Sequence, residues 1–376
     1  MKINKILIIS LIFAILLTVG CAKKFDLKRQ DEILANDWKY PRSNTESTAR
    51  IESEFGGQLN LKWKKKSPDS PIGPLAFGAG KLIMVGKNGR ICFYNPNDGN
   101  YLGRYRFKRA AQTGFLVEDS LGYFSLSNKQ NTFMCKNLYN RNTVWDLEVK
   151  DVTGTPIILQ KNIFFSSALG ELFSLDRLTG DIIWRDSVGY KCLSGPSGQG
   201  EMIVFPLDNG LLNCYNANSG DLHYSINLGE PLVSKAVIGD RIYISSVDGS
   251  MFAVDRNSGA VVWRKNYQNP IWTSPALDQG KIYFGDNAGN LIAVSENDGQ
   301  ILWTYNCDAV ILASPIVVGN YVVFSALDKV LYCLDKSSGA LASKYKFDRE
   351  AEFPPISDGT SIYIAIRGGG LFCFGD

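Results

Sequence analysis

The chain has 376 residues, of which 45% are hydrophobic and 20% charged, and its formal net charge is +3. At this length we expect two domains or an array of repeats rather than one ordinary core. A nearly neutral chain lacks the basic surface that nucleic-acid binding requires, so nucleic acid is not expected as a partner. The single histidine, His223, excludes most zinc and non-haem iron sites and most histidine-based acid–base catalysis.

The N-terminus has the pattern of a secretory signal. Two lysines precede an apolar run over residues 6–17, and a small residue, Gly20, stands directly before Cys21. The apolar run is shorter than the ~20 residues that a transmembrane helix needs. We therefore predict a signal peptide over residues 1–20.

The residues around Cys21 resemble the lipid-modification motif of bacterial lipoproteins. The resemblance implies cleavage before Cys21 and acylation of that residue. Because Ala22 follows instead of aspartate, it also implies an anchor in the outer membrane with the protein facing the periplasm. Several acyl chains, each contributing ~0.8 kcal/mol per buried CH₂, hold such an anchor stably. The alternative is an ordinary signal peptide in which Cys21 is incidental.

Residues 21–58 are expected to form a lipidated tether and lead-in segment. Charged residues, serine, threonine and asparagine dominate this stretch, a composition typical of linkers. Trp38 and the pair Pro41–Arg42 are residues that a pure linker would not need. We therefore expect part of the segment to be ordered.

A repeat of about 40 residues governs residues 59–376. Its reference copy, Gly249–Trp263, contains two apolar runs around a polar turn with glycine, a pattern typical of a β-hairpin. The fifth residue of this copy recurs at steps of 39 to 42 residues, as Phe93, Cys135, Ser174, Cys214, Ala253, Ala293, Cys333 and Cys373. Ten residues later stand Gly103, Trp145, Trp184, Tyr224, Trp263, Trp303 and Ser343, and Trp63 supplies the eighth copy from the N-terminal side.

Each period also contains two earlier strands. One begins at a Ser-Pro-Ala-like step, found at Pro74, Pro156, Pro196, Ser234, Pro275, Pro315 and Pro355. The next is an aromatic-rich run such as residues 281–285. Four short strands per period without helical spacing predict an all-β fold of propeller blades. We predict an eight-bladed β-propeller of four-stranded antiparallel blades over residues 59–376. The segment around Trp63 is expected to close the ring by pairing into the last blade.

The pattern Ala253-x-Asp-x-x-x-Gly259-x-x-x-Trp263 resembles the tryptophan-docking motif of the pyrroloquinoline-quinone-type propellers, and the resemblance covers nearly the whole mature chain. It implies that each indole packs on the small residue ten positions earlier and on the neighbouring blade. An aromatic side chain of this size buries ~150–250 Å², so it needs a small partner. The docking residues implied are Trp63, Trp145, Trp184, Trp263 and Trp303, with Ala253 and Ala293 as small partners.

This family has a catalytic and a non-catalytic branch. Its alcohol-oxidising members carry an adjacent Cys-Cys disulfide, a calcium site and an aspartate base, the latter groups usually on long insertions. This chain has no Cys-Cys pair, and its regular periods leave no insertion to hold such a site. The resemblance therefore implies the other branch, the lipoprotein of the outer-membrane β-barrel assembly machinery, which has no cofactor and no catalytic residues.

The function implied is a scaffold in β-barrel assembly and insertion that binds by strand addition or loop docking. Expected partners are the membrane, the membrane-embedded assembly protein, other members of its complex and unfolded outer-membrane proteins. The propeller is expected to be monomeric. Two alternatives stay open: a quinone-dependent enzyme or sensor, and an envelope lipoprotein that binds a glycan or another protein.

The remaining cysteines are expected to be free. Cys135, Cys214, Cys333 and Cys373 occupy equivalent positions of different blades, whereas a disulfide needs Cα atoms within ~7 Å. We interpret them as small apolar residues. Cys92, Cys192 and Cys307 are also expected to be unpaired.

Four aspartates, Asp208, Asp248, Asp286 and Asp328, each follow the second strand of a blade. They indicate either turn formation or a ring of carboxylates for cations or a basic partner, and neighbouring Asn-Gly and Asp-Gly pairs favour turns. His223 is expected on a strand surface. Lys64, Lys65 and Lys66 follow the closing strand and are expected to be solvated, with contact to lipid headgroups as the alternative.

Overall fold

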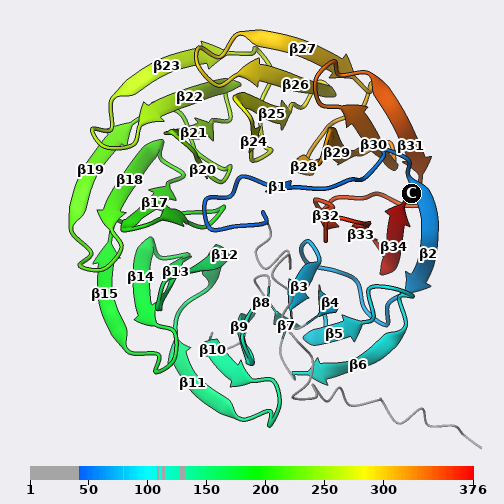
Figure 1. Cartoon of the computed structure of the whole chain (residues 1–376). Helices are drawn as coiled ribbons and strands as arrows, with labels where there is room; N and C mark the ends of the chain where they lie inside the picture. The colour runs from blue at the N-terminus through cyan, green and yellow to red at the C-terminus, as the bar shows by residue number, and fades with distance from the viewer. Residues whose placement is uncertain (1–41, 79, 108–109, 112–114, 128–131) are drawn as a thin grey trace, which may run out of the picture.

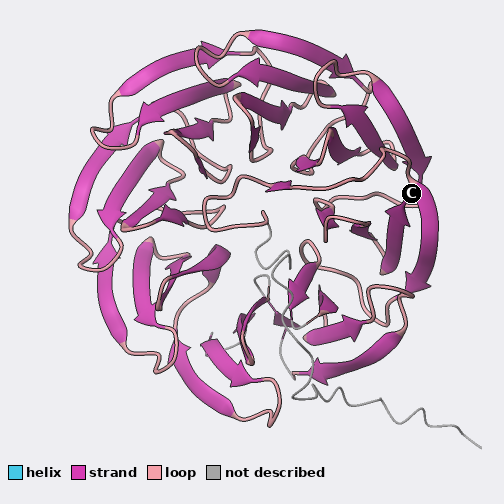
Figure 2. Cartoon of the chain, viewed as in Figure 1, coloured by secondary structure: helices cyan, strands magenta, loops and turns pink. Residues whose placement is uncertain are grey.

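The computed structural model describes residues 42–78, 80–107, 110–111, 115–127 and 132–376 (Figure 1). These residues form strands, turns and loops, and Figure 2 draws no helix among them. In the described part of the chain, no helix is long and apolar enough to cross a membrane.

Eight antiparallel sheets are arranged as blades around a central pore, which confirms the predicted eight-bladed β-propeller (Figure 1). Blade 1 consists of β3 (Ala76–Gly78), β4 (Lys81–Gly86), β5 (Arg90–Tyr94) and β6 (Tyr101–Arg106), and blade 2 of β7 (Ala110–Ala111), β8 (Leu116–Glu118), β9 (Leu121–Ser127), β10 (Thr132–Asn137) and β11 (Thr143–Glu148). Blade 3 consists of β12 (Val152–Leu159), β13 (Asn162–Ser167), β14 (Glu171–Asp176) and β15 (Ile182–Ser187), and blade 4 of β16 (Ser197–Gln199), β17 (Met202–Pro206), β18 (Leu211–Asn216) and β19 (Leu222–Asn227).

Blades 5 to 8 continue the same order around the ring. Blade 5 consists of β20 (Val237–Ile238), β21 (Arg241–Ser245), β22 (Ser250–Asp255) and β23 (Val261–Asn266), and blade 6 of β24 (Ala276–Asp278), β25 (Lys281–Gly285), β26 (Asn290–Ser295) and β27 (Ile301–Asn306). Blade 7 consists of β28 (Ile316–Val318), β29 (Tyr321–Ala326), β30 (Val330–Asp335) and β31 (Leu341–Lys346), and β1 (Arg50–Ile51) pairs with its inner strand. Blade 8 consists of β32 (Ile356–Ser357), β33 (Ile362–Ile366), β34 (Gly370–Gly375) and β2 (Asn60–Lys66).

Each blade runs from an inner strand at the pore to an outer strand at the rim (Figure 1). One face of the ring, here called the hairpin face, carries the turns between the first and second and between the third and fourth strands. The opposite face, the connection face, carries the second-to-third turns and the links from one outer strand to the next inner strand. This division follows from the antiparallel order within every blade.

Burial follows the position of a strand in its blade. In blade 6, the middle strand β26 has four consecutive buried residues from Leu291 to Val294, because neighbouring blades cover both of its faces. The outer strand β27 instead alternates between exposed and partly buried residues. The core is therefore a series of apolar layers between blades.

The ring is closed by the two ends of the chain, as predicted. The strand β2 pairs antiparallel with β34 and places Trp63 opposite Cys373. The backbone N–H of Gly56 donates to the carboxylate of the C-terminal residue Asp376 at 2.6 Å. The last blade thus takes its outer strand from the N-terminal side.

One predicted repeat position is wrong by two residues. In blade 5 the pair Val237–Tyr243 corresponds to the pair Ala276–Tyr283 in blade 6. The residue equivalent to Pro275 is therefore Ala236 instead of Ser234. The paired residues Val237 and Tyr243 are one residue closer in the sequence than their counterparts Ala276 and Tyr283.

Candidate functional site

The docking tryptophans lie opposite a small residue and reach the next blade. The small residue stands ten positions earlier in the chain, except for Trp63, which faces Cys373 at the ring closure. Trp263 faces Ala253, and its indole N–H donates to the carbonyl of Glu296 at 3.1 Å. The turn residue Gly299 has a φ of +69°, and a Cβ there would lie 3.0 Å from the indole, so only glycine fits. The same indole-to-carbonyl bond joins Trp63 to Pro96, Trp145 to Arg177, Trp184 to Ala217 and Trp303 to Lys336.

A β-bulge accompanies every one of these positions. In blade 6 the pairing shifts between Ala293 and Val294, so that Trp303 faces Ala293 whereas Ile301 faces Val294. The extra residue increases the local twist of the outer strand and directs its side chains. An equivalent shift occurs in all eight blades.

Two blades replace tryptophan by another aromatic contact. In blade 4, Tyr224 faces Cys214 and donates its hydroxyl to the carbonyl of Arg256 at 3.1 Å. In blade 1 the large and the small residue have exchanged strands: Phe93 on β5 faces Gly103 on β6. Tyr105, two residues further, donates to the carbonyl of Leu138 in the next blade.

Blade 7 has Ser343 at the tryptophan position, and the reason is the ring closure. The next blade has no outer hairpin turn on which an indole would dock, because its outer strand comes from the other end of the chain. The hydroxyl of Ser343 instead donates to the carbonyl of Gly57 at 2.6 Å and accepts from the N–H of Leu59 at 3.1 Å. This serine holds the incoming N-terminal segment.

The cysteines of the described chain are all free. Burial raises the pKa of Cys135 and Cys333 to about 12 and that of Cys214 and Cys373 to about 11. These thiols are protonated at neutral pH and are therefore poor nucleophiles and metal ligands. The predicted lipidation residue, Cys21, lies outside the described residues.

The recurring aspartates bond to nearby backbone. Asp248 accepts from the N–H of Ser250, Asp286 from those of Ala288 and Asn290, and Asp328 from that of Val330. Asp208 instead accepts from the N–H of Lys191 in the preceding connection. Within the described ranges, no group of three or more His, Cys, Asp or Glu residues is placed to hold a metal ion. His223 is exposed on β19.

The pore is crossed by residues 42–53, here called the pore segment, which the sequence did not reveal (Figure 1). Four equivalent N–H groups of consecutive inner strands donate to its carbonyls: Gly198 to Thr45, Ile238 to Glu46, Leu277 to Thr48 and Val317 to Ala49. The segment then pairs parallel with β28 through Arg50 and Ile51. It therefore follows the inner rim of blades 4 to 7 before leaving toward the hairpin face.

An arc of apolar side chains lies on the connection face. Leu193, Trp272 and Leu312 are exposed, and each stands three residues before the proline position of its blade. The half-buried Val233 fills the same position in blade 5. These four residues, from four consecutive blades, are called the apolar arc. Exposed Tyr190 and Leu169 extend it, and their backbones lie beside each other at Gly170.

Single exposed apolar residues are common, but a repeated exposed position marks a candidate binding surface. Sequence analysis missed this surface because it compared only residues that the repeats share as a framework. The signal was nevertheless present, since leucine and tryptophan recur at one position of the interblade connections.

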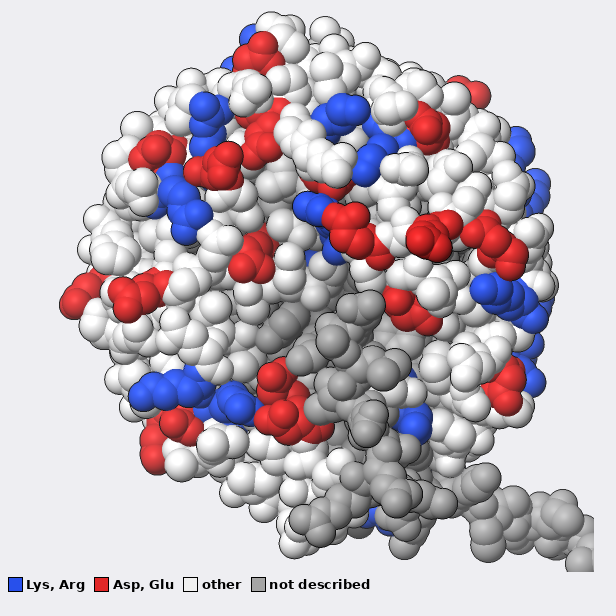
Figure 3. Space-filling view, in the orientation of Figure 1, with Lys and Arg blue, Asp and Glu red and all other residues white. Residues whose placement is uncertain are grey.

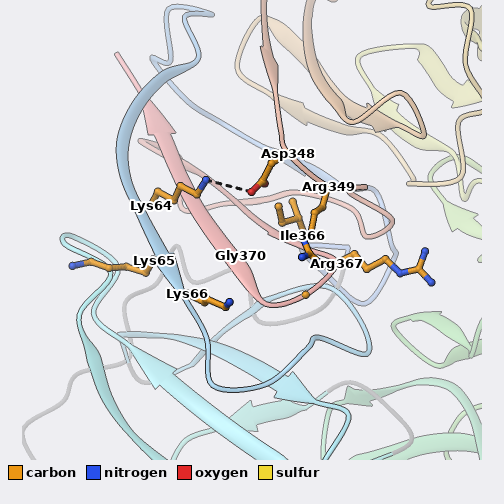
Figure 4. Close-up of a pocket in the computed structure, with 9 residues that line it drawn as sticks. Lys64, Lys65, Lys66, Asp348, Arg349, Ile366, Arg367 and Gly370 are labelled. Carbon is orange, nitrogen blue, oxygen red and sulfur yellow. Dashed lines mark ion pairs between the residues drawn. The ribbon is translucent and has the colours of Figure 1, made fainter.

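A pocket lies at the edge of blade 8 and is lined mainly by charged residues (Figure 4). Lys64 lies 3.8 Å from the carboxylate of Asp348 and 5.0 Å from the ring centre of Phe372. Lys65 and Arg367 point away from the pocket, so the cations do not converge on one point (Figure 4). The three predicted lysines are the last residues of β2 and do not follow the strand.

Charges of both signs are interspersed on the face that the pore segment crosses (Figure 3). Acidic and basic side chains alternate over most of the visible blades, without a continuous field of one sign. Such a surface gives no electrostatic preference for a highly charged partner. The apolar arc is a repeated exposed apolar feature of the connection face; a second set of exposed apolar residues, among them Ile183, Val262 and Leu302, lies on the outer strands.

Comparison with known proteins places the chain in context. The family described as the outer membrane protein assembly factor BamB matches residues 56–186 and 170–374. The BamB proteins of Shewanella oneidensis and Yersinia pestis are each 24% identical to this chain, over 117 and 110 residues respectively. These alignments span 30% and 28% of the chain and the same shares of the two relatives.

Solved structures share the architecture at low identity. BamB from Moraxella catarrhalis superposes with a TM-score of 0.72 at 14% identity, covering 85% of this chain and 98% of that one. Quinohemoprotein alcohol dehydrogenase from Comamonas testosteroni gives a TM-score of 0.77 at 11% identity, covering 95% and 83%. Such likeness shows the fold alone. The match to the family extends over most of the propeller, and the chain belongs to the family of the outer membrane protein assembly factor BamB.

Proposed function

We propose that this protein is a non-catalytic scaffold in the assembly of outer-membrane β-barrel proteins. The observation that carries the proposal is the apolar arc, an exposed and repeated apolar surface on a propeller of this family. We assign the arc as the docking surface for another member of the assembly machinery, the membrane-embedded assembly protein. No residue is assigned a catalytic role.

The composition of the arc suits a protein interface. Aromatic residues dominate binding energy at interfaces because they bury large apolar areas with few rotatable bonds. Trp272 is 51% exposed, and Tyr190 adds a second aromatic side chain in the connection that carries Leu193. A stable interface buries about 800 Å² per partner, and a surface that spans four blades offers an area of that order.

The blades hold this surface rigidly. Connections that carry the arc residues are short, and the blades beneath them are joined by indole-to-carbonyl bonds at the other face. Side chains on a rigid support lose little conformational entropy when a partner binds. A scaffold function fits this preorganisation.

The proposed location is the periplasmic side of the outer membrane, with Cys21 as the lipid-anchored residue. From Cys21 to Arg42 the chain has 21 peptide steps, which span at most roughly 70 Å when fully extended. The propeller is thereby confined near the membrane in which its partner is embedded. Confinement raises the effective concentration of the partner, so a docking surface of modest area suffices.

Affinity purification from detergent-solubilised membranes tests the proposal. The full chain is expected to recover the barrel-assembly protein, and Trp272→Asp is expected to lower this recovery at least tenfold. Leu178→Asp is the matched control, because Leu178 is equally exposed but lies in an outer hairpin turn of blade 3. Recovery that is absent, or equal in all three proteins, contradicts the proposal.

The two alternative functions predict different results. A quinone-dependent enzyme would show a spectral change and dye reduction after addition of pyrroloquinoline quinone and calcium. A glycan-binding lipoprotein would be retained on immobilised envelope glycans and not with the assembly protein. Either positive result, without recovery of the assembly protein, replaces the scaffold proposal.

A further inference from the structure

Two cationic side chains are buried in the pore. Arg42 begins the pore segment, and Lys235 precedes the inner strand of blade 5; each residue is only 5% exposed. Register places Lys235 at the position that Ser274 and Ser314 hold in blades 6 and 7. A long cation therefore stands at a position where the neighbouring blades have a small neutral residue.

Neither cation has its hydrogen-bonding capacity satisfied. Arg42 donates from Nε to the carbonyl of Ser47 at 3.2 Å and from one terminal nitrogen to that of Pro275. Its other terminal nitrogen, Nη1, is buried and has no hydrogen-bond partner among the described residues. Within the same part of the chain, the ammonium of Lys235 makes one long contact, 3.5 Å to the carbonyl of Thr155.

The two charges share one region of the pore. The backbone N–H of Lys235 donates to Ser274, and Arg42 donates to the adjacent residue, Pro275. The pKa of Lys235 is lowered to about 7, mainly by burial and to a smaller extent by the positive charge of Arg42. The thiol of Cys192 is the other titratable group that acts on Lys235, and burial holds that thiol in its protonated form.

Elsewhere in the same ring, a buried charge is compensated by partners of opposite sign. The buried carboxylate of Asp278 lies 2.9 Å from Arg50 and 2.7 Å from Lys336. Among the residues that the structure describes, no carboxylate lies within ion-pair distance of Arg42 or Lys235. A buried charge without a partner is strongly unfavourable, so the missing component of this arrangement is an anion.

We propose that the pore binds a small oxyanion, a carboxylate or phosphate group, between Arg42 and Lys235. A guanidinium and an ammonium offer several charge-assisted hydrogen bonds to such a group. The inference does not rest on the proposed scaffold function.

The test uses the full chain purified in detergent. Its melting temperature is measured while phosphate or acetate replaces chloride at constant ionic strength and pH 6. The variant Lys235→Ser introduces the residue that blades 6 and 7 carry at this position, so it is expected to fold. Lys346→Ser is the control, because it removes the same charge from an exposed position on β31.

The wild-type protein and Lys346→Ser are expected to show a saturable rise in melting temperature. Lys235→Ser is expected to weaken the apparent affinity at least tenfold. A response to acetate as well as phosphate identifies a carboxylate site, and a response to phosphate alone identifies a tetrahedral oxyanion site. No response in the wild type, or an equal response in Lys235→Ser, overturns the proposal.

If Lys235→Ser does not fold, the wild type tests the proposal by itself. The apparent affinity for acetate or sulfate, anions whose charge does not change between these values, is then compared at pH 6 and pH 9. Loss of the ammonium charge at the higher pH is expected to weaken binding about tenfold. Binding of equal strength at both pH values overturns the proposal.

Discussion

At the scale of single residues, the same amino acid has opposite roles in two places. Trp263 is 9% exposed and joins two blades through its ring and its indole N–H, whereas Trp272 is 51% exposed on the apolar arc. The repeat made the first role readable, since a tryptophan ten residues after a small residue recurs in the sequence. Nothing local to Trp272 distinguished it before its exposure was known.

Replacing these two tryptophans by alanine is therefore expected to have different effects. Trp263→Ala removes a buried indole and leaves a cavity between blades 5 and 6, which should destabilise the protein by about 3–5 kcal/mol. Trp272→Ala should change the free energy of unfolding by less than about 0.5 kcal/mol. Urea unfolding measures both values, and equal losses would contradict the assigned positions.

Lys235 gives a prediction about pH. Its pKa is about 7 in the folded protein, below the ordinary lysine value, so the unfolded chain binds more protons between these two values. Stability contributed by this group therefore rises as pH increases above 7, and the penalty of burying the charge is fully present below 7. In Lys235→Met this penalty is absent.

The expected result is a variant whose advantage over the wild type shrinks by about 2 kcal/mol between pH 7 and pH 9. The free energies of unfolding are compared in buffers free of phosphate and carboxylates. Other titrating groups are shared by both proteins and cancel in the difference. If the difference in the free energy of unfolding does not change with pH, the pKa of Lys235 is not lowered by burial.

At the scale of elements, the sequence revealed the strands better than the pore segment. Middle strands such as β26 are continuous apolar runs, and outer strands follow a polar turn with glycine. The pore segment is held mainly through its own carbonyls, which any sequence possesses. Its path could therefore not be predicted, and Trp38 and Pro41, from which local order was expected, lie outside the described residues.

The hydrogen bonds between the inner strands and the pore segment predict slow hydrogen exchange at the inner edges of the blades. The N–H groups of Gly198, Ile238, Leu277 and Val317 belong to inner strands that have no further strand of their own blade beside them. Bonded to the pore segment, they should exchange as slowly as the middle strands. Exchange as fast as that of the outer hairpin turns, measured by mass spectrometry, would show that the segment is not bound.

At the scale of the whole molecule, the described residues include seven free cysteines, of which five lie on strands of five different blades and two in connections between blades. Six are buried, and Cys307 is partly exposed. Because only thiolates react rapidly, we expect a thiol reagent to label Cys307 slowly in the native protein and the buried six only on unfolding. If the propeller unfolds cooperatively, all six buried cysteines should become labelled in a single unfolding transition. Labelling of one buried cysteine well before the others would contradict this.

The number of blades and the closure of the ring were predictable because the repeat leaves one strand missing at the C-terminus and one extra around Trp63. The apolar arc and the two buried cations in the pore, Arg42 and Lys235, were not predictable in the same way. Both depend on side chains from different blades that meet only in the closed ring. Register was needed to recognise that Lys235 and Ser274 are equivalent.

The closure also determines the order in which the strands can pair during synthesis. Asn60 pairs with Gly375, so the first strand of the propeller stays without its partner until the last residues of the chain have emerged. The earlier blades form from local hairpins, whereas this final pairing joins residues far apart in the sequence and is correspondingly slow. Until it forms, two unpaired strand edges stand open to other chains. The nascent propeller therefore requires protection from other chains with unpaired strands until its ring is closed.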